Sequence, residues 1–445
     1  MKRILLCVGV SALLAGSPSL AKDHKSTTQQ TSKQELVPAP LRSDAATPVP
    51  AHPSPYNFPG VAYPRIEQDS RVTFQFKAPN AQKVQVAIAN VPYDMVKGDN
   101  GVWTYTSDPQ APGYHNYWMV VDGAVVLDPG TNAFIGYGHM CNGFEIPEPG
   151  VTFYDLKDVP HGNVIIKNYF AKTSNSWRHI FIYTPPGYEK GSVRYPVFYL
   201  QHGGGEDERV WTEMGRTNLI LDNLLAEGKV KPMIVVMETS AVGPPPVRPA
   251  TPAPAPGAAP GAVAPRGGGF PGMAAVGGAY AKLMINDLIP WVDSNFRTIP
   301  DKDHRAMAGL SMGGFMTASV TMSNLDKFSY IGLFSGGTAA GFGAGGRGSP
   351  VPVNAPPPQP ATLDLKTIYS GAMADPAKFN KEVKVFFFSC GTEPPLENPA
   401  ALKKHQEQLI AAGITNSYLY ISPGTSHEWQ TWRRSLYVFA PLLFR

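Results

Sequence analysis

Two hydrophobic patterns divide the chain. In residues 71–121, apolar positions alternate with polar ones, as at Val72, Phe74 and Phe76. A period of two is typical of half-buried strands, and turn signals separate the runs. Four such runs can be read, at residues 72–76, 84–88, 102–106 and 114–121. They predict a small immunoglobulin-like β-sandwich over residues 61–150.

From about residue 160 onward, continuous apolar runs alternate with helical segments. Continuous runs are typical of strands that are buried on both faces. They lie at residues 177–184, 195–200, 233–237, 304–308, 383–389 and 418–421. Between them, Tyr280, Leu283, Met284 and Leu288 recur at spacings of three and four, which predicts a helix with one buried face. This alternation predicts a doubly wound, mostly parallel α/β sheet over residues 160–445.

Proline and glycine mark the segments outside these two regions. The 445 residues include 44 glycines and 45 prolines, and the share of proline is about twice its average. Residues 22–60 are polar and proline-rich, which predicts a disordered linker. Two stretches at about 242–278 and 336–360 are dominated by small residues and proline, and we expect low-complexity loops inserted into the second region.

The N-terminus has the pattern of an export signal. Lys2 and Arg3 precede an apolar stretch, Ile4–Ala15, that is short for a membrane span. Small residues at Ser19 and Ala21 predict cleavage after Ala21, and hence a signal peptide over residues 1–21 and a periplasmic or extracellular location. An uncleaved membrane anchor is the alternative. No other segment is apolar enough to cross a membrane.

Charge and cysteine content exclude several classes of protein. The 38 basic and 34 acidic residues give a net charge of +4 with no long basic run after the N-terminus, which argues against a nucleic-acid partner. Outside the signal, Cys141 and Cys390 are expected to be buried free thiols, with a disulfide as the alternative. Histidines and carboxylates do not fall at metal-binding spacings, so we expect neither a metal nor another cofactor.

The segment Gly309-Leu310-Ser311-Met312-Gly313 matches the pattern Gly-x-Ser-x-Gly. It follows a predicted strand and precedes a helical pattern, and this context is the one that a nucleophile elbow requires. The glycines allow close backbone approach, and the serine stands at a helix N-terminus that stabilises negative charge. We therefore expect Ser311 to be a nucleophile, and an idle serine in a glycine-rich turn is the alternative.

A second glycine-rich segment lies upstream. The apolar run 195–200 leads into Gln201-His202-Gly203-Gly204-Gly205, which resembles the HGGG-type motif that supplies an oxyanion N–H group. We assign the oxyanion donors to the backbone N–H groups of Gly204 and Met312, with Gly203 as the alternative. No Gly-Lys-Ser/Thr follows, so a phosphate-binding P-loop is excluded.

The general base is expected near the C-terminus, because this type of site orders its residues as serine, acid and histidine. His427 lies in a turn after the run 418–421, at the end of a predicted strand where α/β sites form. A structural role in the loop is the alternative for His427. His405 falls in an amphipathic helical pattern over residues 401–411, where we expect a solvated surface residue.

The acid should follow the run 383–389. Glu393 is the first choice there and Glu397 the second, since either carboxylate could orient an imidazole. A surface glutamate, with the acid supplied elsewhere by a residue such as Asp375, stays open.

Four segments in this order resemble the "putative esterase" family of α/β-hydrolases. That family includes the feruloyl and acetylxylan esterases of carbohydrate esterase family one and the enterochelin esterases. The matching segments are residues 195–205, 287–293, 308–314 and 426–429. The resemblance implies an α/β-hydrolase fold for residues 160–445, and residues 61–150 are similar to the carbohydrate-binding-module-like sandwich that often precedes such esterases. The acid loop departs from the pattern, because Glu393-Pro394-Pro395 stands where relatives often carry aspartate.

The resemblance implies a secreted serine carboxylic ester hydrolase that acts on feruloyl or acetyl esters of plant cell-wall polysaccharide. An enterochelin-type siderophore or other small-molecule esterase is one alternative, and a carbohydrate-binding protein without activity is another. Trp211, Trp429 and Trp432 could stack on an aromatic acyl group or a sugar ring, although core positions are as compatible with the sequence. The expected partner is an ester substrate, and the sequence contains no signal for an oligomeric state.

Overall fold

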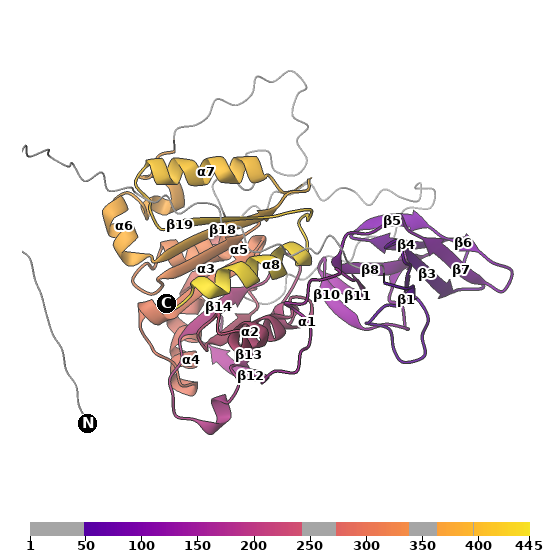
Figure 1. Cartoon of the computed structure of the whole chain (residues 1–445), viewed down its shortest axis with the longest axis horizontal. Helices are drawn as coiled ribbons and strands as arrows, with labels where there is room; N and C mark the ends of the chain where they lie inside the picture. Colours follow the sequence, from indigo (N-terminus) through magenta and orange to yellow (C-terminus); the bar gives the residue numbers. More distant parts are fainter. Residues whose placement is uncertain (1–48, 243–272, 338–362, 395) are drawn as a thin grey trace, which may run out of the picture. The chain divides into compact units, whose positions relative to one another are not determined.

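The computed structural model describes residues 49–242, 273–337, 363–394 and 396–445 (Figure 1). The predicted signal peptide, most of the predicted linker and most of both predicted insertions lie outside the described residues. Residues 49–60, which fall in the predicted linker, include a short strand, β1. Its pairing with β2 shows that this part of the proline-rich stretch is ordered against the strands that follow.

Two antiparallel sheets occupy the first part of the described chain, here called the two-sheet region (residues 52–146). The first sheet has the order β1 (His52–Pro53), β2 (Arg65–Ile66), β3 (Val72–Lys77), β7 (Val102–Thr106) and β6 (Val96–Lys97). The second has the order β10 (Ala133–Gly136), β11 (His139–Ile146), β8 (Gly113–Val121), β4 (Val84–Ile88) and β5 (Val91–Asp94), and β9 (Ala124–Val126) also pairs with β8. All four strands predicted from the period of two are present.

The two sheets share one hydrophobic core. Val72 and Phe74 of β3 pack with Val86 of β4 and Phe144 of β11, as the alternation of apolar positions requires. Four large aromatic residues of this region are buried as well: Trp103, Tyr114, Tyr117 and Trp118.

An eight-stranded sheet forms the second part of the chain. Its order is β12 (Asn163–Ala171), β13 (Ser176–Thr184), β15 (Ile234–Glu238), β14 (Val197–Gln201), β16 (Arg305–Leu310), β17 (Tyr330–Phe334), β18 (Val385–Gly391) and β19 (Ser417–Ser422). The pairs β12–β13 and β13–β15 are antiparallel, and the other pairs are parallel. All six apolar runs are strands, whereas β12 and β17 were not predicted.

Helices cover both faces of this sheet (Figure 1). They are α1 (Val210–Glu213), α2 (Thr217–Ala226), α3 (Met273–Leu283), α4 (Ile289–Asn295), α5 (Met312–Met322), α6 (Pro376–Glu382), α7 (Pro399–Ala411) and α8 (Trp429–Phe439), with short turns η1 (Tyr188–Lys190), η2 (Met284–Leu288), η3 (Lys302–His304), η4 (Ile368–Gly371) and η5 (Ala440–Leu442). On β14, Phe198 and Leu200 pack with α1, α2 and α8, while Tyr199 packs with α3 to α5. Burial on both faces explains why the parallel strands read as continuous apolar runs.

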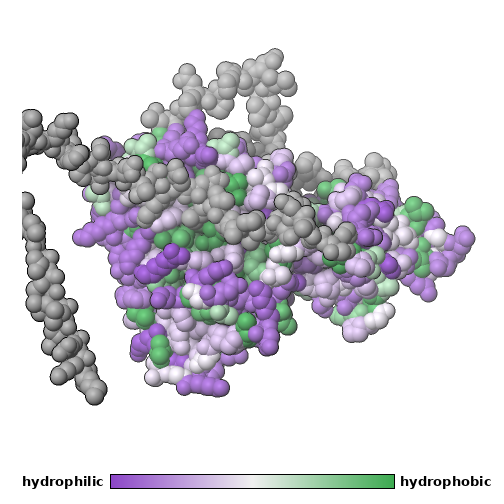
Figure 2. Space-filling model, in the orientation of Figure 1, coloured by the Kyte–Doolittle hydropathy of each residue, from purple (hydrophilic) through white to green (hydrophobic). Residues whose placement is uncertain are grey.

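The helix predicted from Tyr280 and Leu288 is confirmed, and it runs through α3, η2 and α4. It begins at Met273, inside the predicted insertion, so the loop there is shorter than its composition indicated. Figure 2 shows hydrophilic and hydrophobic residues intermingled on the face in view. Within the described ranges, no helix combines the length and the apolar character that a membrane span requires.

Candidate active site

Ser311 lies at a sharp turn between β16 and α5. Its backbone angles, φ 51° and ψ −116°, are unusual for a residue other than glycine and typify a strained nucleophile elbow. Glycine is required on both sides. A Cβ on Gly309 would lie 2.4 Å from the carbonyl oxygen of Gly313, and one on Gly313 would lie 2.4 Å from that of His202. The motif therefore brings the serine onto the loop that follows β14.

Three side chains from separate loops form a continuous hydrogen-bonded chain. Ser311 Oγ lies 2.9 Å from His427 Nε2, and His427 Nδ1 lies 2.9 Å from Glu397 Oε1. The loops follow β16, β19 and β18, whose carboxyl ends meet at one edge of the sheet. With its proton on Nδ1, the imidazole donates to the carboxylate and accepts from the serine, which is the arrangement that activates a hydroxyl.

The structure places Glu397, the second choice, and not Glu393 at the imidazole. Glu393 is exposed, and its carboxylate accepts a hydrogen bond from Thr392 Oγ1 at 2.9 Å. Its backbone N–H donates to Thr425 O, so the chain runs beside the histidine loop with this side chain turned outward. The chain then returns so that Glu397, just before α7, is buried with 3% of its side chain exposed. Asp375 instead caps α6 by accepting from the backbone of Lys378.

The two candidate glycines of the oxyanion loop differ in their N–H groups. Gly203 N donates to Glu206 Oε2 at 2.8 Å, so this N–H is occupied. Gly204 N donates to none of the described residues, and a Cβ on Gly204 would lie 3.9 Å from the Cβ of Met312. Met312 begins α5, where the N–H groups have no acceptor within the helix. The geometry therefore favours Gly204 and Met312 over Gly203 as the pair of donors.

Glu206 follows the glycines directly, and the pKa of its carboxyl group lies well above the usual value. Burial raises the pKa of Glu206 to about 8, and the charge of Asp207 adds to this effect. A carboxyl group that is neutral near pH 7 thus lies at the base of the oxyanion loop. The sequence contained its position, directly after the HGGG-type motif, but no signal that its side chain would be half-buried beside Gly203.

The buried side chain of His202 connects the oxyanion loop to the loop after β15 by two hydrogen bonds. Its Nδ1 donates to the carbonyl oxygen of Gly203 at 2.7 Å, and its Nε2 accepts from the backbone of Ser240 at 3.0 Å. Burial lowers the pKa of His202, which keeps the ring neutral and able to accept this second bond. The loop after β15 is thereby tied to the loop after β14.

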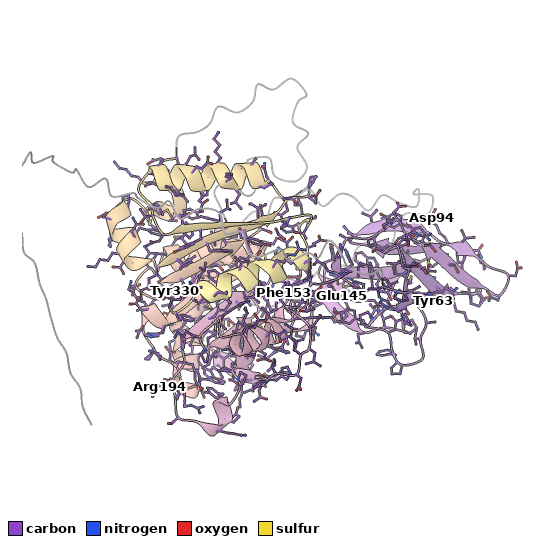
Figure 3. All side chains as sticks on the ribbon, viewed as in Figure 1. Tyr63, Asp94, Glu145, Phe153, Arg194 and Tyr330 are labelled. Atoms are coloured by element: carbon purple, nitrogen blue, oxygen red, sulfur yellow. The ribbon has the colours of Figure 1, made fainter. Side chains whose placement is uncertain are left out.

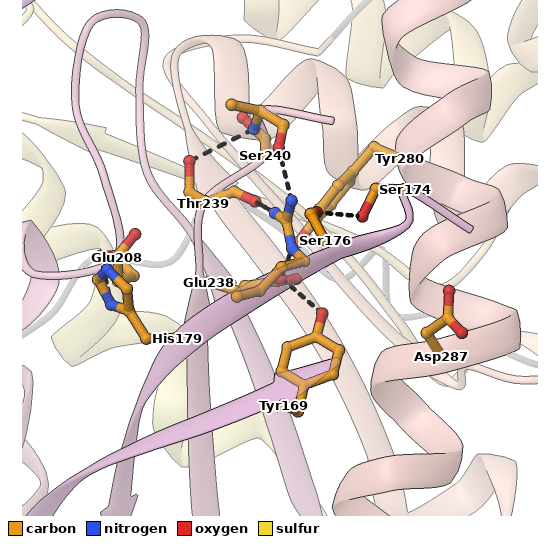
Figure 4. Close-up of polar contacts among 12 residues, drawn as sticks. Tyr169, Ser174, Ser176, His179, Glu208, Glu238, Thr239, Ser240, Tyr280 and Asp287 are labelled. Carbon is orange, nitrogen blue, oxygen red and sulfur yellow. Dashed lines mark hydrogen bonds and ion pairs between the residues drawn. The ribbon is translucent and has the colours of Figure 1, made fainter. Parts of the chain in front are cut away.

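A buried polar cluster fixes the loop after β15 in turn (Figure 4). Arg178 donates to the carbonyl oxygens of Thr239 at 2.6 Å and Ala241 at 2.8 Å, and it pairs with Glu238. Tyr169 OH also donates to Glu238 at 2.6 Å. Despite the arginine, burial raises the pKa of Glu238 to about 6. Sequence patterns gave no indication of this cluster, because its residues are far apart along the chain.

The three tryptophans for which the sequence left substrate stacking and a core position open are core residues. Trp211, Trp429 and Trp432 are only 1%, 3% and 6% exposed. Trp211 and Trp432 both pack edge-on against Trp429, and Trp432 also meets the ring of His427 at 5.2 Å between centroids. Their burial favours the core position over stacking on an acyl group or a sugar, and Trp432 packs against the His427 imidazole.

Three further titratable residues, one histidine and two cysteines, are buried. The expectation that His405 is solvated is wrong: it is 2% exposed on α7, and burial lowers its pKa to about 4. Cys141 and Cys390 are buried free thiols, and burial raises the pKa of each to about 12. The described ranges contain no group of three histidine, cysteine or acidic residues that could hold a metal ion.

The sheet order, the elbow and the helices on both faces define an α/β-hydrolase. A family model described as "Putative esterase" matches residues 171–441, which is more than half of the chain. The chain therefore belongs to this family.

Several known proteins are similar to parts of this chain. An endo-1,4-beta-xylanase/feruloyl esterase from Xylanibacter ruminicola is 36% identical over 402 residues, covering 88% of this chain and 47% of that protein. Endo-1,4-beta-xylanase Y from Acetivibrio thermocellus is 23% identical over 308 residues, covering 65% of this chain and 24% of that protein. This chain thus spans half or less of the length of both relatives. The solved enterobactin esterase of Shigella flexneri shares the fold, with a TM-score of 0.54, 14% identity, and coverage of 84% of this chain and 92% of that one.

Proposed function

We propose that this protein is a serine esterase that works through an acyl-enzyme. The hydrogen-bonded chain from Ser311 through His427 to Glu397 carries this proposal. Ser311 Oγ attacks the ester carbonyl carbon while His427 takes its proton. The bond to the alcohol then breaks, and His427 returns the proton to the leaving oxygen. Water deacylates the enzyme by the same route, and Glu397 stabilises the imidazolium without accepting its proton.

The negative oxygen of the tetrahedral intermediate would be bound by the N–H groups of Gly204 and Met312. Met312 contributes the start of a helix of 11 residues, whose dipole adds to the stabilisation. Each such donor is worth about 3–4 kcal/mol of transition-state stabilisation by the usual mutational measure.

Feruloyl or acetyl esters of plant cell-wall polysaccharide are the proposed substrates. This choice is supported by the xylanase/feruloyl esterase name of the relative that is 36% identical over 88% of this chain. We also propose that the two-sheet region is an immunoglobulin-like, carbohydrate-binding-module-like sandwich. If it binds glycan, residues other than its buried core aromatics must make the contact.

The decisive test replaces Ser311 with alanine. We expect Ser311→Ala to lower kcat on methyl ferulate and p-nitrophenyl acetate by at least about 10⁴-fold. Ser323→Ala, at the exposed far end of α5, is the control and should retain wild-type activity. Equal activity of the Ser311→Ala and wild-type proteins would refute the mechanism.

A substrate panel tests the acyl and alcohol groups separately. It contains feruloylated arabinoxylan oligosaccharides, acetylated xylan and enterobactin. Release of ferulate or acetate from the polysaccharide fragments is expected. Hydrolysis of enterobactin alone would favour the small-molecule esterase, and xylan binding without hydrolysis would favour the inactive binding protein.

Export is a separate proposal from the same sequence. We propose that the chain is secreted through the signal at residues 1–21. N-terminal sequencing of the protein from cell fractions should find Lys22 as the first residue, and an intact N-terminus in the membrane fraction would show an anchor instead.

A further inference from the structure

Two adjacent arginines of α8 are buried, and each pairs with a carboxylate of the segment around the end of β11. Arg433, which is 0% exposed, pairs with Glu145 at 2.5 Å, and Arg434, which is 3% exposed, pairs with Glu148. Figure 3 labels Glu145. Burial alone would raise the pKa of Glu145, but the charges of Arg433 and Arg216 hold it below its usual value. These carboxylates belong to the two-sheet region and the turn that follows it, so α8 is anchored outside the eight-stranded sheet.

The two arginines differ in what else they hold. Arg434 Nη1 donates to Pro423 O at 2.8 Å and to Ser422 Oγ at 3.2 Å. These residues begin the loop that carries the histidine, here called the histidine loop (residues 422–428). Arg433 Nε instead donates to Met214 O at 2.8 Å, away from that loop. Only the Glu148–Arg434 pair therefore connects to the histidine loop.

The histidine loop and the first turn of α8 form one hydrogen-bonded unit. Thr425 Oγ1 donates to Ser422 Oγ at 2.7 Å, and Thr431 Oγ1 contacts Thr425 Oγ1 at 2.7 Å and Ser426 O at 2.5 Å. All three hydroxyl-bearing residues Ser422, Thr425 and Thr431 are buried. Because these groups are buried and hydrogen-bonded to one another, a displacement of Arg434 should shift Ser426, whose Oγ accepts a hydrogen bond from the backbone N–H of His427 at 2.6 Å.

Close packing strengthens the anchor at Glu148. Gln430, which is fully buried one turn before Arg434, also donates to the Glu148 carboxylate. A Cβ on Gly113 of β8 would lie 2.9 Å from the Cβ of Gln430, so only glycine lets this strand approach α8 closely. Glu148 thus accepts from two residues of the helix that begins just after His427.

We propose that Glu148 is a positioning residue, which acts through Arg434 to hold the His427 imidazole in line with Ser311 Oγ. The inference rests on the proposed serine esterase mechanism. It gives the segment after β11 a role in the reaction, although this segment lies outside both the residues of the family match and the elbow motif. A misplacement of about 1 Å in such a constellation lowers the rate by as much as about 10²-fold.

The chain provides a matched control. Glu148→Gln and Glu145→Gln each remove the negative charge of a buried carboxylate that pairs with an arginine of α8. Both variants should therefore have a lower Tm than the wild type. At a temperature well below both Tm values, we expect Glu148→Gln to lower kcat about tenfold or more with KM changed less than about twofold. Its rate of covalent labelling by a fluorophosphonate should fall in parallel, whereas Glu145→Gln should keep kcat and the labelling rate within about twofold of wild type. Equal kcat and labelling rates in the two folded variants would overturn the inference.

A second variant decides the matter if Glu148→Gln does not fold. Ser422→Ala removes an acceptor of Arg434 on the loop and leaves the Glu148–Arg434 pair in place. We expect kcat to fall about threefold at unchanged KM, and an unchanged kcat would overturn the inference. Failure of the esterase mechanism is distinguishable, because the wild-type protein would then show neither ester hydrolysis nor labelling at Ser311.

Discussion

The serine and the histidine of the candidate site are held by two different kinds of structure. At the elbow, backbone contacts dominate: Ser311 N donates to Phe334 O at 2.8 Å, and Gly313 lies against the backbone that follows β14. At the histidine loop, buried side chains do the same work, through the bonds of Thr425, Thr431 and Arg434.

This difference determines how easily each part is recognised in the sequence and how strongly a substitution there affects catalysis. Backbone contacts need only small residues at fixed positions, so a five-residue motif between a strand and a helix specifies the elbow. The histidine loop depends on partners from Glu148 to Arg434, which are almost three hundred positions apart in the sequence. We therefore expect single side-chain changes on the histidine side to reduce catalysis by graded amounts. The first experiment below examines the histidine side, and the next two examine the oxyanion loop beside the elbow.

The largest effect is expected at the acid. Glu397→Gln keeps the size of the side chain but removes the charge that fixes the imidazole tautomer and stabilises the imidazolium. We expect kcat on p-nitrophenyl acetate to fall about 10³-fold or more, with KM little changed. Glu393→Gln, four residues earlier and exposed, should stay within about twofold of wild type.

Steady-state kinetics on the two purified variants make this comparison, and circular dichroism verifies that both are folded. A large loss for Glu393→Gln with none for Glu397→Gln would restore the sequence-based first choice and contradict the geometry described above.

An intermediate effect is expected at the oxyanion loop. Gly205 has φ +78°, and a Cβ there would lie 2.6 Å from the backbone nitrogen of Gly138, which donates to Gly205 O. Gly205→Ala should therefore displace the loop and lower kcat about tenfold. Gly187 has nearly the same φ, +79°, and a Cβ on it would have nothing within 4 Å, so Gly187→Ala supplies the same backbone strain away from the site.

Thermal unfolding and kcat are measured for both alanine variants. Both should lose about 1 kcal/mol of stability from the left-handed backbone, but only Gly205→Ala should lose activity beyond this. If both retain full kcat, the contact between Gly138 and Gly205 has no influence on the oxyanion loop.

The sequence predicted the features that a local pattern marks and missed or left open those that depend on tertiary contacts. Strands buried on both faces, such as β14 and β16, could be predicted because their apolar runs are continuous. β12 was missed because it is an edge strand with several exposed residues, among them Ile166 at 60% exposure. β17 is buried throughout and has five residues, the same length as β14, so neither its length nor its burial explains why it was not predicted.

In the site, Ser311 and His427 could be singled out because a local motif or a loop position marks each of them. Glu397 could not be separated from Glu393, since the direction of a side chain in an irregular loop depends on tertiary contacts such as Glu393 N to Thr425 O. The position of Trp429 stayed open because an aromatic residue near a catalytic loop has the same sequence appearance whether it is buried or exposed.

The smallest and most specific effect is expected from Glu206. A Cβ on Gly203 would lie 2.9 Å from Glu206 Oε2 and 3.6 Å from Ser311 Cβ, so the carboxyl group and the nucleophile flank the same glycine. Burial raises the pKa of Glu206 from 4.5 to about 8. Between these two values the folded protein holds a proton that the unfolded chain has lost, so this group's contribution to stability is present at low pH and declines as the pH rises to about 8.

Ionisation above about pH 8 would place a negative charge beside the site of the developing oxyanion. We expect kcat of the wild type to fall about threefold through this step. Glu206→Gln keeps an oxygen acceptor for Gly203 N but cannot ionise. Its kcat should therefore lack the alkaline decline, and its Tm should fall less between about pH 5 and pH 8. If kcat of both proteins declines equally at alkaline pH, another group titrates there. Glu206 would then only accept the hydrogen bond from Gly203 N. In that case Glu206 would support the backbone of the oxyanion loop, as the glycines of the elbow do, and would not influence the reaction through its charge.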